Sequence, residues 1–448
     1  MKRFFPNWTT LFLSITIFLL PWQTRWMYSE VSIAGAHTEF GVMSLYAVEL
    51  LLAAALIGGS ILDRKWWTID AKRQLPVRLG GIVLIVAVLG TAFADRSAFS
   101  LSTVTHLGLA YALFVAILID RVSVKHLLFA FVVSLAAPFV LGLIQVFGGS
   151  SPANSWLGLA YRDASQLGDA VFTASGERVL RTYGSFPHPN VFGGFLGVGL
   201  FAWWAFMAQV KSLPPFMGGI GGGLFRRKMM VITSIGTVVL IIGMLLTGSR
   251  SAFLGLFVGL ALVFVVKSIP SMKIARPAAA ILGIVAVFGS LLASFYLTDL
   301  ASSIRGGGVN EERSLTERIA LYEDFVPFMA STNLVVGHGL GSYVLSFSDF
   351  ESGKSVFDYQ PVHNVFLLIL AELGFLGLAA MLCWGANVAW INVSRFPHRD
   401  ALYAFGMGNV VFMICFFDHY LWSSWSGLAL IAFAMGMMVR LGEEKEGR

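Results

Sequence analysis

Long apolar segments recur along the whole chain, and they constrain its fold more than any other feature. The 448 residues are 57% hydrophobic and 12% charged, and the mean hydropathy is +0.77. One water-excluding core cannot bury so much apolar surface, whereas a bilayer accommodates it as helices of about 20 residues. The sequence therefore predicts an all-α polytopic integral membrane protein that forms a single transmembrane domain over residues 1–448, with about twelve transmembrane helices. The predicted spans are residues 8–22, 40–62, 79–94, 99–119, 127–147, 190–210, 230–246, 251–266, 277–297, 364–390, 401–417 and 420–439.

The distribution of Lys and Arg predicts the orientation of these spans. If the N-terminus is cytoplasmic, alternating spans return the C-terminus to the cytoplasm, and about two thirds of the 31 Lys and Arg residues lie on the cytoplasmic side. Membrane proteins commonly show this bias. Residues 1–22 have a basic start and an apolar run, as a signal peptide does. No small-residue cleavage site follows them, so we interpret them as an uncleaved first span.

Two of the predicted outer segments are long enough to form secondary structure of their own. The first covers residues 148–189, and the second, residues 298–362, is a large loop between spans 9 and 10. Within the first, strand-like runs on either side of Gly176 predict a small hairpin at about residues 171–181, because Gly is favoured in tight turns.

The second outer segment is predicted to be partly helical. Ser314 and Glu317 have the spacing of a capping box, so we expect a helix to begin there. Arg318 lies beside the apolar stripe of this helix, which is typical of a helix on a membrane surface. A glycine-rich stretch at residues 337–341 then leads toward the next span. The apolar stripe consists of Leu315, Ile319, Tyr322 and Val326.

A histidine, His363, stands at the outer mouth of the apolar segment that follows this loop. Asn364 comes next, and Gly374 and Gly377 lie further along the segment. On one continuous helix the histidine and both glycines would share a face, since residues follow one another by about 100°. Small residues on that face would let a neighbouring helix approach closely and fix the direction of the imidazole.

Two arginines are predicted to lie at the same outer level as this histidine. Arg181 precedes span 6, and Arg250 precedes span 8. Both spans run from outside to inside, as the span after His363 does, so their positive N-terminal dipole ends face outward. Arginine forks and helix N-termini both bind phosphate oxygens, so we expect a diphosphate at this surface.

The chemistry that fits this surface is proton abstraction beside a diphosphate. A histidine can accept a proton from a sugar hydroxyl, and arginines can offset charge that develops on a lipid diphosphate leaving group. The sequence therefore predicts transfer of a glycan from a lipid diphosphate on the outer side of the membrane, with His363 as the catalytic base and Arg181 and Arg250 as diphosphate ligands. Possible further substrate contacts are Asn190, Arg318, His338 and Asn364, and also His188, Asp418 and His419.

Several other kinds of site are not supported by the sequence. Both cysteines, Cys383 and Cys415, lie in apolar segments, and no helical His-Glu-x-x-His pattern is present, so we predict no metal and no cofactor. The glycine-rich stretch at residues 218–223 lacks the Gly-Lys-Ser/Thr ending of a nucleotide-binding loop, and we interpret it as a flexible linker. The basic residues are dispersed between spans, which argues against nucleic acid as a partner. Glu372 is expected to be a buried hydrogen-bonding residue.

Two motifs resemble a known family. His363-Asn364, nine residues and then Gly374-x-x-Gly377 resemble the signature of the O-antigen ligase and related O-oligosaccharyltransferase superfamily. The segment Arg181-x-x-Gly184-Ser185-Phe186, followed by Pro189-Asn190, is similar to its other recurrent segment. Twelve spans with a large outer loop between spans 9 and 10 also fit.

The resemblance implies a glycosyltransferase of the Gram-negative inner membrane with its active site at the periplasmic face. It would transfer O-antigen from undecaprenyl diphosphate to the lipid A core oligosaccharide, without metal or nucleotide and with inversion at the anomeric carbon. By the same resemblance His363 would be the base, Arg181 and Arg250 would hold the diphosphate, and Arg318 would contact substrate.

Three other functions stay open from the sequence. An O-antigen polymerase joins two lipid-linked glycans, and a protein O-oligosaccharyltransferase uses the same donor with a protein acceptor. A transporter of lipid-linked glycans belongs to a different class and would be expected to line its route with intramembrane charges. The charges here lie mostly at the outer surface, which favours the transferases.

Overall fold

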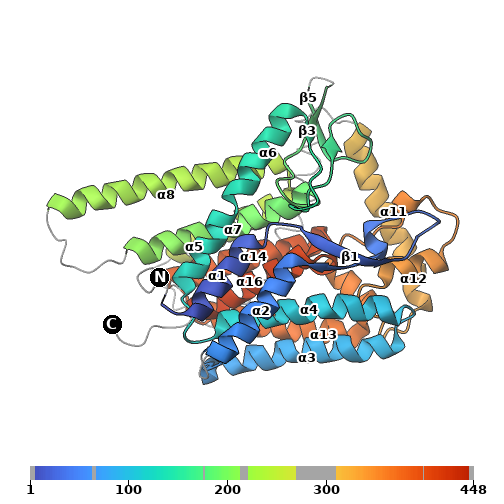
Figure 1. The fold of residues 1–448 in the computed structure, drawn as a ribbon, viewed down its shortest axis with the longest axis horizontal. Coiled ribbons are helices and arrows are strands. Elements are labelled where there is room, and N and C mark those ends of the chain that lie inside the picture. Colours follow the sequence, from blue (N-terminus) through green and yellow to red (C-terminus); the bar gives the residue numbers. More distant parts are fainter. Residues whose placement is uncertain are drawn as a thin grey trace.

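The structure is a computed structural model, and it describes residues 6–62, 67–174, 177–211, 220–268, 309–396 and 398–442. Within these residues the chain is mainly helical, and three short two-stranded sheets accompany the helices. Most of the long helices run side by side along one direction, and the strands lie with α11 and α12 toward one end of the bundle (Figure 1). The helices are α1 (Trp8–Leu19), α2 (Ala47–Leu62), α3 (Gln74–Gly90), α4 (Ser97–Leu118), α5 (Val124–Ser134), α6 (Ala136–Gly148), α7 (Pro189–Lys211), α8 (Ile220–Thr247), α9 (Arg250–Ser268), α11 (Val309–Ser331), α12 (Tyr343–Phe350), α13 (Val365–Val393), α14 (Arg399–Phe417), α15 (Tyr420–Ser423) and α16 (Trp425–Gly442), and the strands are β1 (Arg25–Glu30), β2 (Val42–Tyr46), β3 (Ser150–Ser151), β4 (Arg162–Asp163), β5 (Val171–Ala174) and β6 (Glu177–Leu180).

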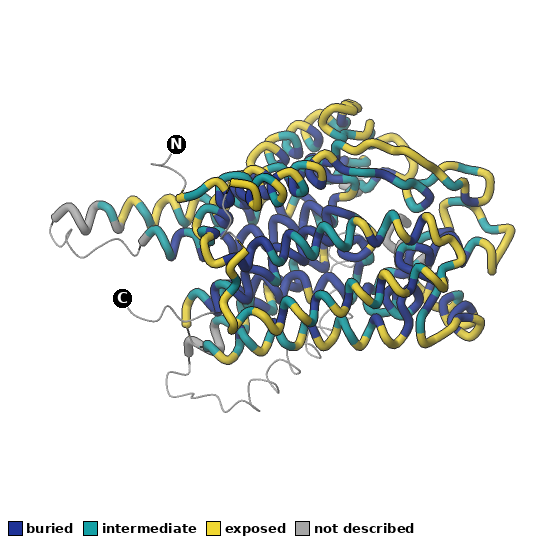
Figure 2. Tube along the Cα trace, turned by 60° about the horizontal axis from the view of Figure 1, so that its bottom comes forward, coloured by how far each residue is buried: buried dark blue, intermediate teal, exposed yellow. Residues whose placement is uncertain are grey.

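The core of the bundle is built around α7, α14 and α16. These helices are the most buried of the long apolar helices, and they pack against one another and against α4 and α9. Figure 2 shows buried residues along the middle of the bundle and exposed residues on the outer helices. Exposed apolar side chains on α3 and α8 are expected of helices that face lipid.

The helices confirm the predicted class of a polytopic all-α membrane protein. Eight helices in the described part of the chain are long and apolar enough to cross a membrane, and three shorter apolar helices begin at Trp8, Ala47 and Arg250. Together they match every predicted span except residues 277–297, which lie outside the described residues. The total of twelve and the orientation stay predictions.

Several predicted boundaries differ from the structure. The segment 420–439 is interrupted at Ser424, between α15 and α16. The segment 40–62 begins with strand β2, and only Ala47–Leu62 is helical. The segment 127–147 is divided into α5 and α6 near Pro138, which lacks the N–H that a continuous helix needs. The flexible linker predicted at residues 218–223 is wrong for residues 220–223, which belong to α8, and residues 218 and 219 lie outside the described residues.

The predicted hairpin in the first outer segment is confirmed. Strands β5 and β6 pair antiparallel, with Val171 opposite Leu180 and Ala174 opposite Glu177. A second hairpin, β1 with β2, was not predicted, and it is interrupted by a bulge between Met27 and Ser29.

The helix of the second outer segment starts earlier than its capping-box pattern predicted. Helix α11 begins at Val309, so Ser314 lies inside it. A nucleated helix continues through a residue that local sequence alone would favour as a cap. Along α11, Ile319 and Val326 of the predicted stripe are 50% and 68% exposed. Phe325, on another face of the helix, is buried in the protein.

Helix α13 is broken at Gly374, and this corrects the predicted continuous face. Gly374 has φ 64° and ψ −167°, outside the helical region, and His363 precedes the helix. A Cβ at Gly374 would lie 2.3 Å from the backbone of Val335, so only glycine lets the loop before α12 approach here. The N–H of Phe375 donates to the carbonyl of Leu334 (2.8 Å), which ties this loop into the membrane helix.

Candidate active site

His363 lies immediately before the N-terminus of α13. Asn364 is the N-cap of that helix, and its Oδ1 accepts hydrogen bonds from the backbone N–H groups of Phe366 (3.0 Å) and Leu367 (3.1 Å). The hydroxyl of Tyr322, on α11, donates to the carbonyl oxygen of His363 at 3.4 Å. The cap and α11 therefore fix the backbone from which the imidazole projects.

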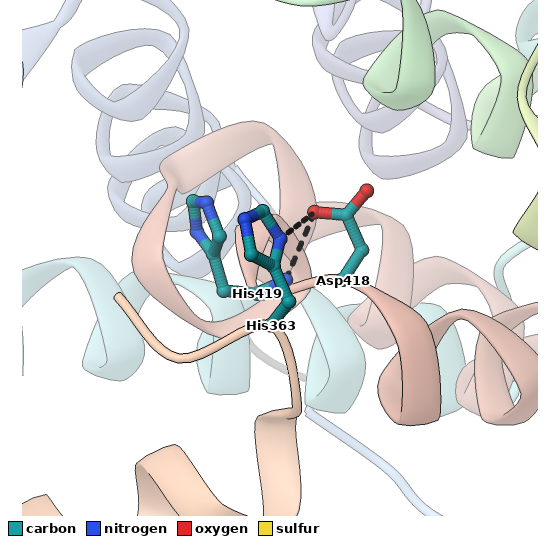
Figure 3. A group of neighbouring side chains, drawn as sticks. All are labelled: His363, Asp418 and His419. Carbon is teal, nitrogen blue, oxygen red and sulfur yellow. Dashed lines mark hydrogen bonds and ion pairs between the residues drawn. The ribbon is translucent and has the colours of Figure 1, made fainter. Parts of the chain in front are cut away.

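Asp418, the residue that ends α14, faces this imidazole. Its Oδ1 lies 3.8 Å from Nδ1 of His363, and the two side chains are 6% and 19% exposed, respectively. Figure 3 shows the carboxylate beside the His363 ring, with the ring of His419 on the other side of it. The carboxylate also accepts from the backbone N–H of His419 (2.9 Å) and from Nδ2 of Asn190 (2.8 Å). Nδ1 of His363 is buried without a hydrogen-bond partner, so a small movement toward Asp418 would complete the pair.

The surroundings of Asp418 keep it ionised. Burial opposes the charged form, but the facing imidazole of His363 and the positive charge of Arg318 lower the pKa of Asp418 well below its usual range. A carboxylate that stays ionised can hold a histidine in one tautomer and stabilise the imidazolium that forms when the ring accepts a proton.

Arg181 reaches the same carboxylate through Asn190. Its guanidinium donates to the carbonyl oxygen of Thr247 through Nε (2.7 Å) and to Oδ1 of Asn190 through a terminal nitrogen (2.8 Å). These hydrogen bonds and the contact between Asp418 and His363 link four polar side chains. The chain runs from the end of β6 through the start of α7 and the end of α14 to the residues just before α13. We call it the polar chain, and its members are Arg181, Asn190, Asp418 and His363.

The turn that carries Arg250 lies against Arg181. Arg250 opens α9 and is exposed. Gly248, two residues earlier, has φ 62°, and a Cβ there would lie 2.6 Å from the ring of Phe172 and 3.3 Å from Nε of Arg181. The two predicted arginines are therefore brought to one region by the close packing of this turn.

His419 and Arg318 complete the cluster. The rings of His363 and His419 are 5.0 Å apart. Burial, and then the neighbouring charge of His363, lowers the pKa of His419 to about 3, so its ring is neutral near pH 7. Arg318 contributes to the pKa shifts of both Asp418 and His419, which places its charge near the cluster. Phe40, from the unpredicted hairpin, packs edge-on against His419 with ring centroids 5.9 Å apart.

The structure gives two other predicted contact residues roles within the protein. His338 forms hydrogen bonds with Oδ2 of Asp95 through Nδ1 (2.7 Å) and with the hydroxyl of Thr332 through Nε2 (2.8 Å). A substrate would have to replace one of these hydrogen bonds to bind His338. The backbone N–H of Asn190 donates to Nδ1 of His188, at the start of α7. Glu372 is buried and accepts from Nε1 of Trp422 (2.8 Å), which confirms its predicted hydrogen-bonding role.

His363, Asp418 and His419 are also the kind of residues that bind metals. One ligand atom from each lies within 4.8 Å of the others, so a modest closing movement would let them share an ion. The charge of Arg318 acts on two of the three, and Arg181 is joined to the third by Asn190. These cationic neighbours oppose a metal cation and favour an anion such as a phosphate.

The fold and the cluster together define a class: a multi-pass membrane protein with a histidine–carboxylate pair and several arginines at one end of its bundle. Residues 235–382 match a family model described as O-antigen ligase, which supports the predicted membership of the O-antigen ligase superfamily. This segment contains Arg250, Arg318 and His363, whereas Arg181 and Asp418 join the site only in three dimensions. No curated protein matched the chain.

Proposed function

We propose that the protein is an O-antigen ligase. It transfers an O-antigen polysaccharide en bloc from undecaprenyl diphosphate to a sugar hydroxyl of the lipid A core oligosaccharide. The reaction takes place at the periplasmic face of the Gram-negative inner membrane and completes lipopolysaccharide. The observation that carries the proposal is the polar chain, because it joins a candidate diphosphate ligand, Arg181, to a candidate base, His363.

In the proposed reaction His363 acts as the general base. Its Nδ1 faces Asp418, so Nε2 is the nitrogen that accepts the proton of the acceptor hydroxyl. The acceptor oxygen then attacks the anomeric carbon of the donor sugar from the side opposite the diphosphate. The bond between that carbon and the diphosphate oxygen breaks, and undecaprenyl diphosphate leaves with the bonding electrons. Attack from the opposite side inverts the anomeric carbon.

The arginines supply the charge that the leaving group needs. Arg181, Arg250 and Arg318 carry fixed positive charge, which stabilises the diphosphate more strongly as the glycosidic bond breaks. A diphosphate is already a good leaving group, and with three arginines at hand the reaction requires neither a metal nor a nucleotide. Asn190 would hold Arg181 and Asp418 at a constant spacing, so the base and the diphosphate ligand keep their alignment.

The acceptor decides between this function and its nearest rivals. The family match supports ligase or polymerase chemistry in general. We would reconstitute the purified protein in liposomes with a fluorescent lipid diphosphate-linked glycan and a chelator, and offer three acceptors in parallel. The acceptors are lipid A core oligosaccharide, a second lipid-linked glycan and a serine-containing peptide.

Labelled lipid A core would support the ligase. A lengthened lipid-linked glycan would establish a polymerase instead, and a labelled peptide would establish a protein O-oligosaccharyltransferase. Movement of the donor across the bilayer without any covalent product would contradict enzymatic function altogether and leave the transporter.

A further inference from the structure

The hairpin between α1 and α2 reaches the candidate site from the far end of the sequence. Strands β1 and β2 flank a short 3-10 turn at Glu39–Gly41, and this turn packs against α12. Figure 1 shows the hairpin extending from α1 toward the end of the bundle that holds α11 and α12. Phe40, in the middle of the turn, is half-buried and meets the ring of His419 at 5.9 Å, with 68° between the two planes.

His419 lies between Phe40 of the 3-10 turn and the candidate base, His363. Nδ1 of His419 hydrogen bonds to the hydroxyl of Ser423 (2.7 Å), so Nε2 is the nitrogen through which it would meet a ligand. Its ring centroid is 5.0 Å from that of His363. Three aromatic rings therefore pack one after another, in the order Phe40, His419, His363.

The two carboxylate oxygens of Asp418 face different neighbours, and this indicates where each substrate would bind. Its Oδ2 binds Asn190 and through it Arg181, which is the candidate diphosphate side. Its Oδ1 faces His363 and the backbone of His419, which lead to Phe40. The diphosphate and the acceptor must approach the reacting carbon from opposite directions, so the acceptor belongs on the side of Phe40 and His419.

We propose that Phe40 and His419 form the acceptor subsite and that this subsite takes a saccharide. The proposal rests on the proposed function, because it assumes that His363 activates an acceptor hydroxyl. An aromatic face packs against the C–H groups of a sugar ring, and Nε2 of a neutral imidazole forms one hydrogen bond with a sugar hydroxyl. His419 has the required neutral form, since its pKa is lowered to about 3.

The two residues would bind the acceptor and would not act as bases, so their substitution has a distinct kinetic signature. Phe40→Ala and His419→Gln each raise the KM for the saccharide acceptor about five- to tenfold, the loss expected for one ring contact or one hydrogen bond. The KM for the lipid diphosphate donor changes less than twofold. Two controls come from the same hairpin region: Trp26→Ala, at a side chain that is 69% exposed, and His37→Gln, at one that is 79% exposed. Both controls keep wild-type constants.

The experiment measures initial rates in liposomes, with donor and acceptor varied separately, and thermal unfolding of every variant. His419→Gln is the second variant in case Phe40→Ala does not fold. An unchanged acceptor KM, or an equal rise in donor and acceptor KM, overturns the subsite while leaving the ligase intact. If the wild type transfers glycan to peptide and not to saccharide, the subsite is also wrong. If the wild type transfers nothing, the proposed function itself has failed, and the subsite falls with it.

Discussion

Asp418→Asn tests the pairing of carboxylate and imidazole on which the proposed mechanism depends. The substitution keeps the size of the side chain and its bond to Asn190 but removes the charge 3.8 Å from Nδ1 of His363. At an effective dielectric constant of about 20, a charge pair at this distance is worth about 4 kcal/mol. The His363 side chain is 19% exposed, so solvent screening reduces this toward roughly 2 kcal/mol.

The charge matters most when His363 becomes an imidazolium, so its loss raises the barrier of the chemical step. We expect kcat to fall about 30- to 1000-fold, with the KM for donor and acceptor changed less than about threefold. The assay is initial-rate glycan transfer in liposomes with saturating substrates. Asp349→Asn is the matched control, because its carboxylate pairs with Arg96 at the surface and is 58% exposed. A folded Asp418→Asn variant with wild-type kcat would refute the reasoning.

The same carboxylate predicts a pH dependence of stability. The pKa of Asp418 is lower in the folded protein than the unfolded value of about 3.9, so its stabilising charge is fully present above about pH 4 and is lost as the pH falls toward the folded pKa. The difference in thermal unfolding temperature between the wild type and Asp418→Asn should therefore shrink below about pH 4. A difference that stays constant or grows on acidification would contradict the assignment.

Two further substitutions test how the site is supported. Gly374→Ala places a Cβ 2.3 Å from the backbone of Val335 at φ 64°, and we expect a loss of at least about 2 kcal/mol in stability. Thermal unfolding measures it against Gly385→Ala, whose Cβ would meet only an atom 3.9 Å away and should change little. Arg181→Lys keeps the charge but cannot span the two acceptors that the guanidinium binds, so transfer should fall about 10- to 100-fold in initial-rate assays. Arg178→Lys, in the same hairpin, should stay near wild type, and equal losses in both variants would count against a special role for Arg181.

Sequence patterns predicted the elements whose causes are local. Hydropathy located the spans, because a membrane helix needs a long apolar run, and the turn at Gly176 predicted the β5–β6 hairpin. Position in the topology also indicated that Arg181, Arg250 and His363 face the same side. The structure brings Arg181 and His363 into one polar chain and packs the turn before Arg250 against Arg181.

The missed features depend on contacts between distant residues. Asn190 and Asp418 are 228 positions apart, and nothing near either one in the sequence indicates their hydrogen bond. Phe40 was assigned to a membrane span because hydropathy alone does not distinguish the apolar strand β2 from the start of a helix. The break at Gly374 was missed because glycine is common in membrane helices, and only the approach of Val335 shows why it is needed here.

The central claim is that His363 is the base of a glycan transfer, and single-turnover kinetics test it most directly. Purified wild type and His363→Ala would be loaded with labelled lipid diphosphate-linked glycan, checked for equal donor binding, and mixed with excess lipid A core in the presence of a chelator. We predict rapid labelling of the core by the wild type and a rate at least about 1000-fold lower for His363→Ala, with donor binding retained. Labelling by His363→Ala at the wild-type rate would contradict the account.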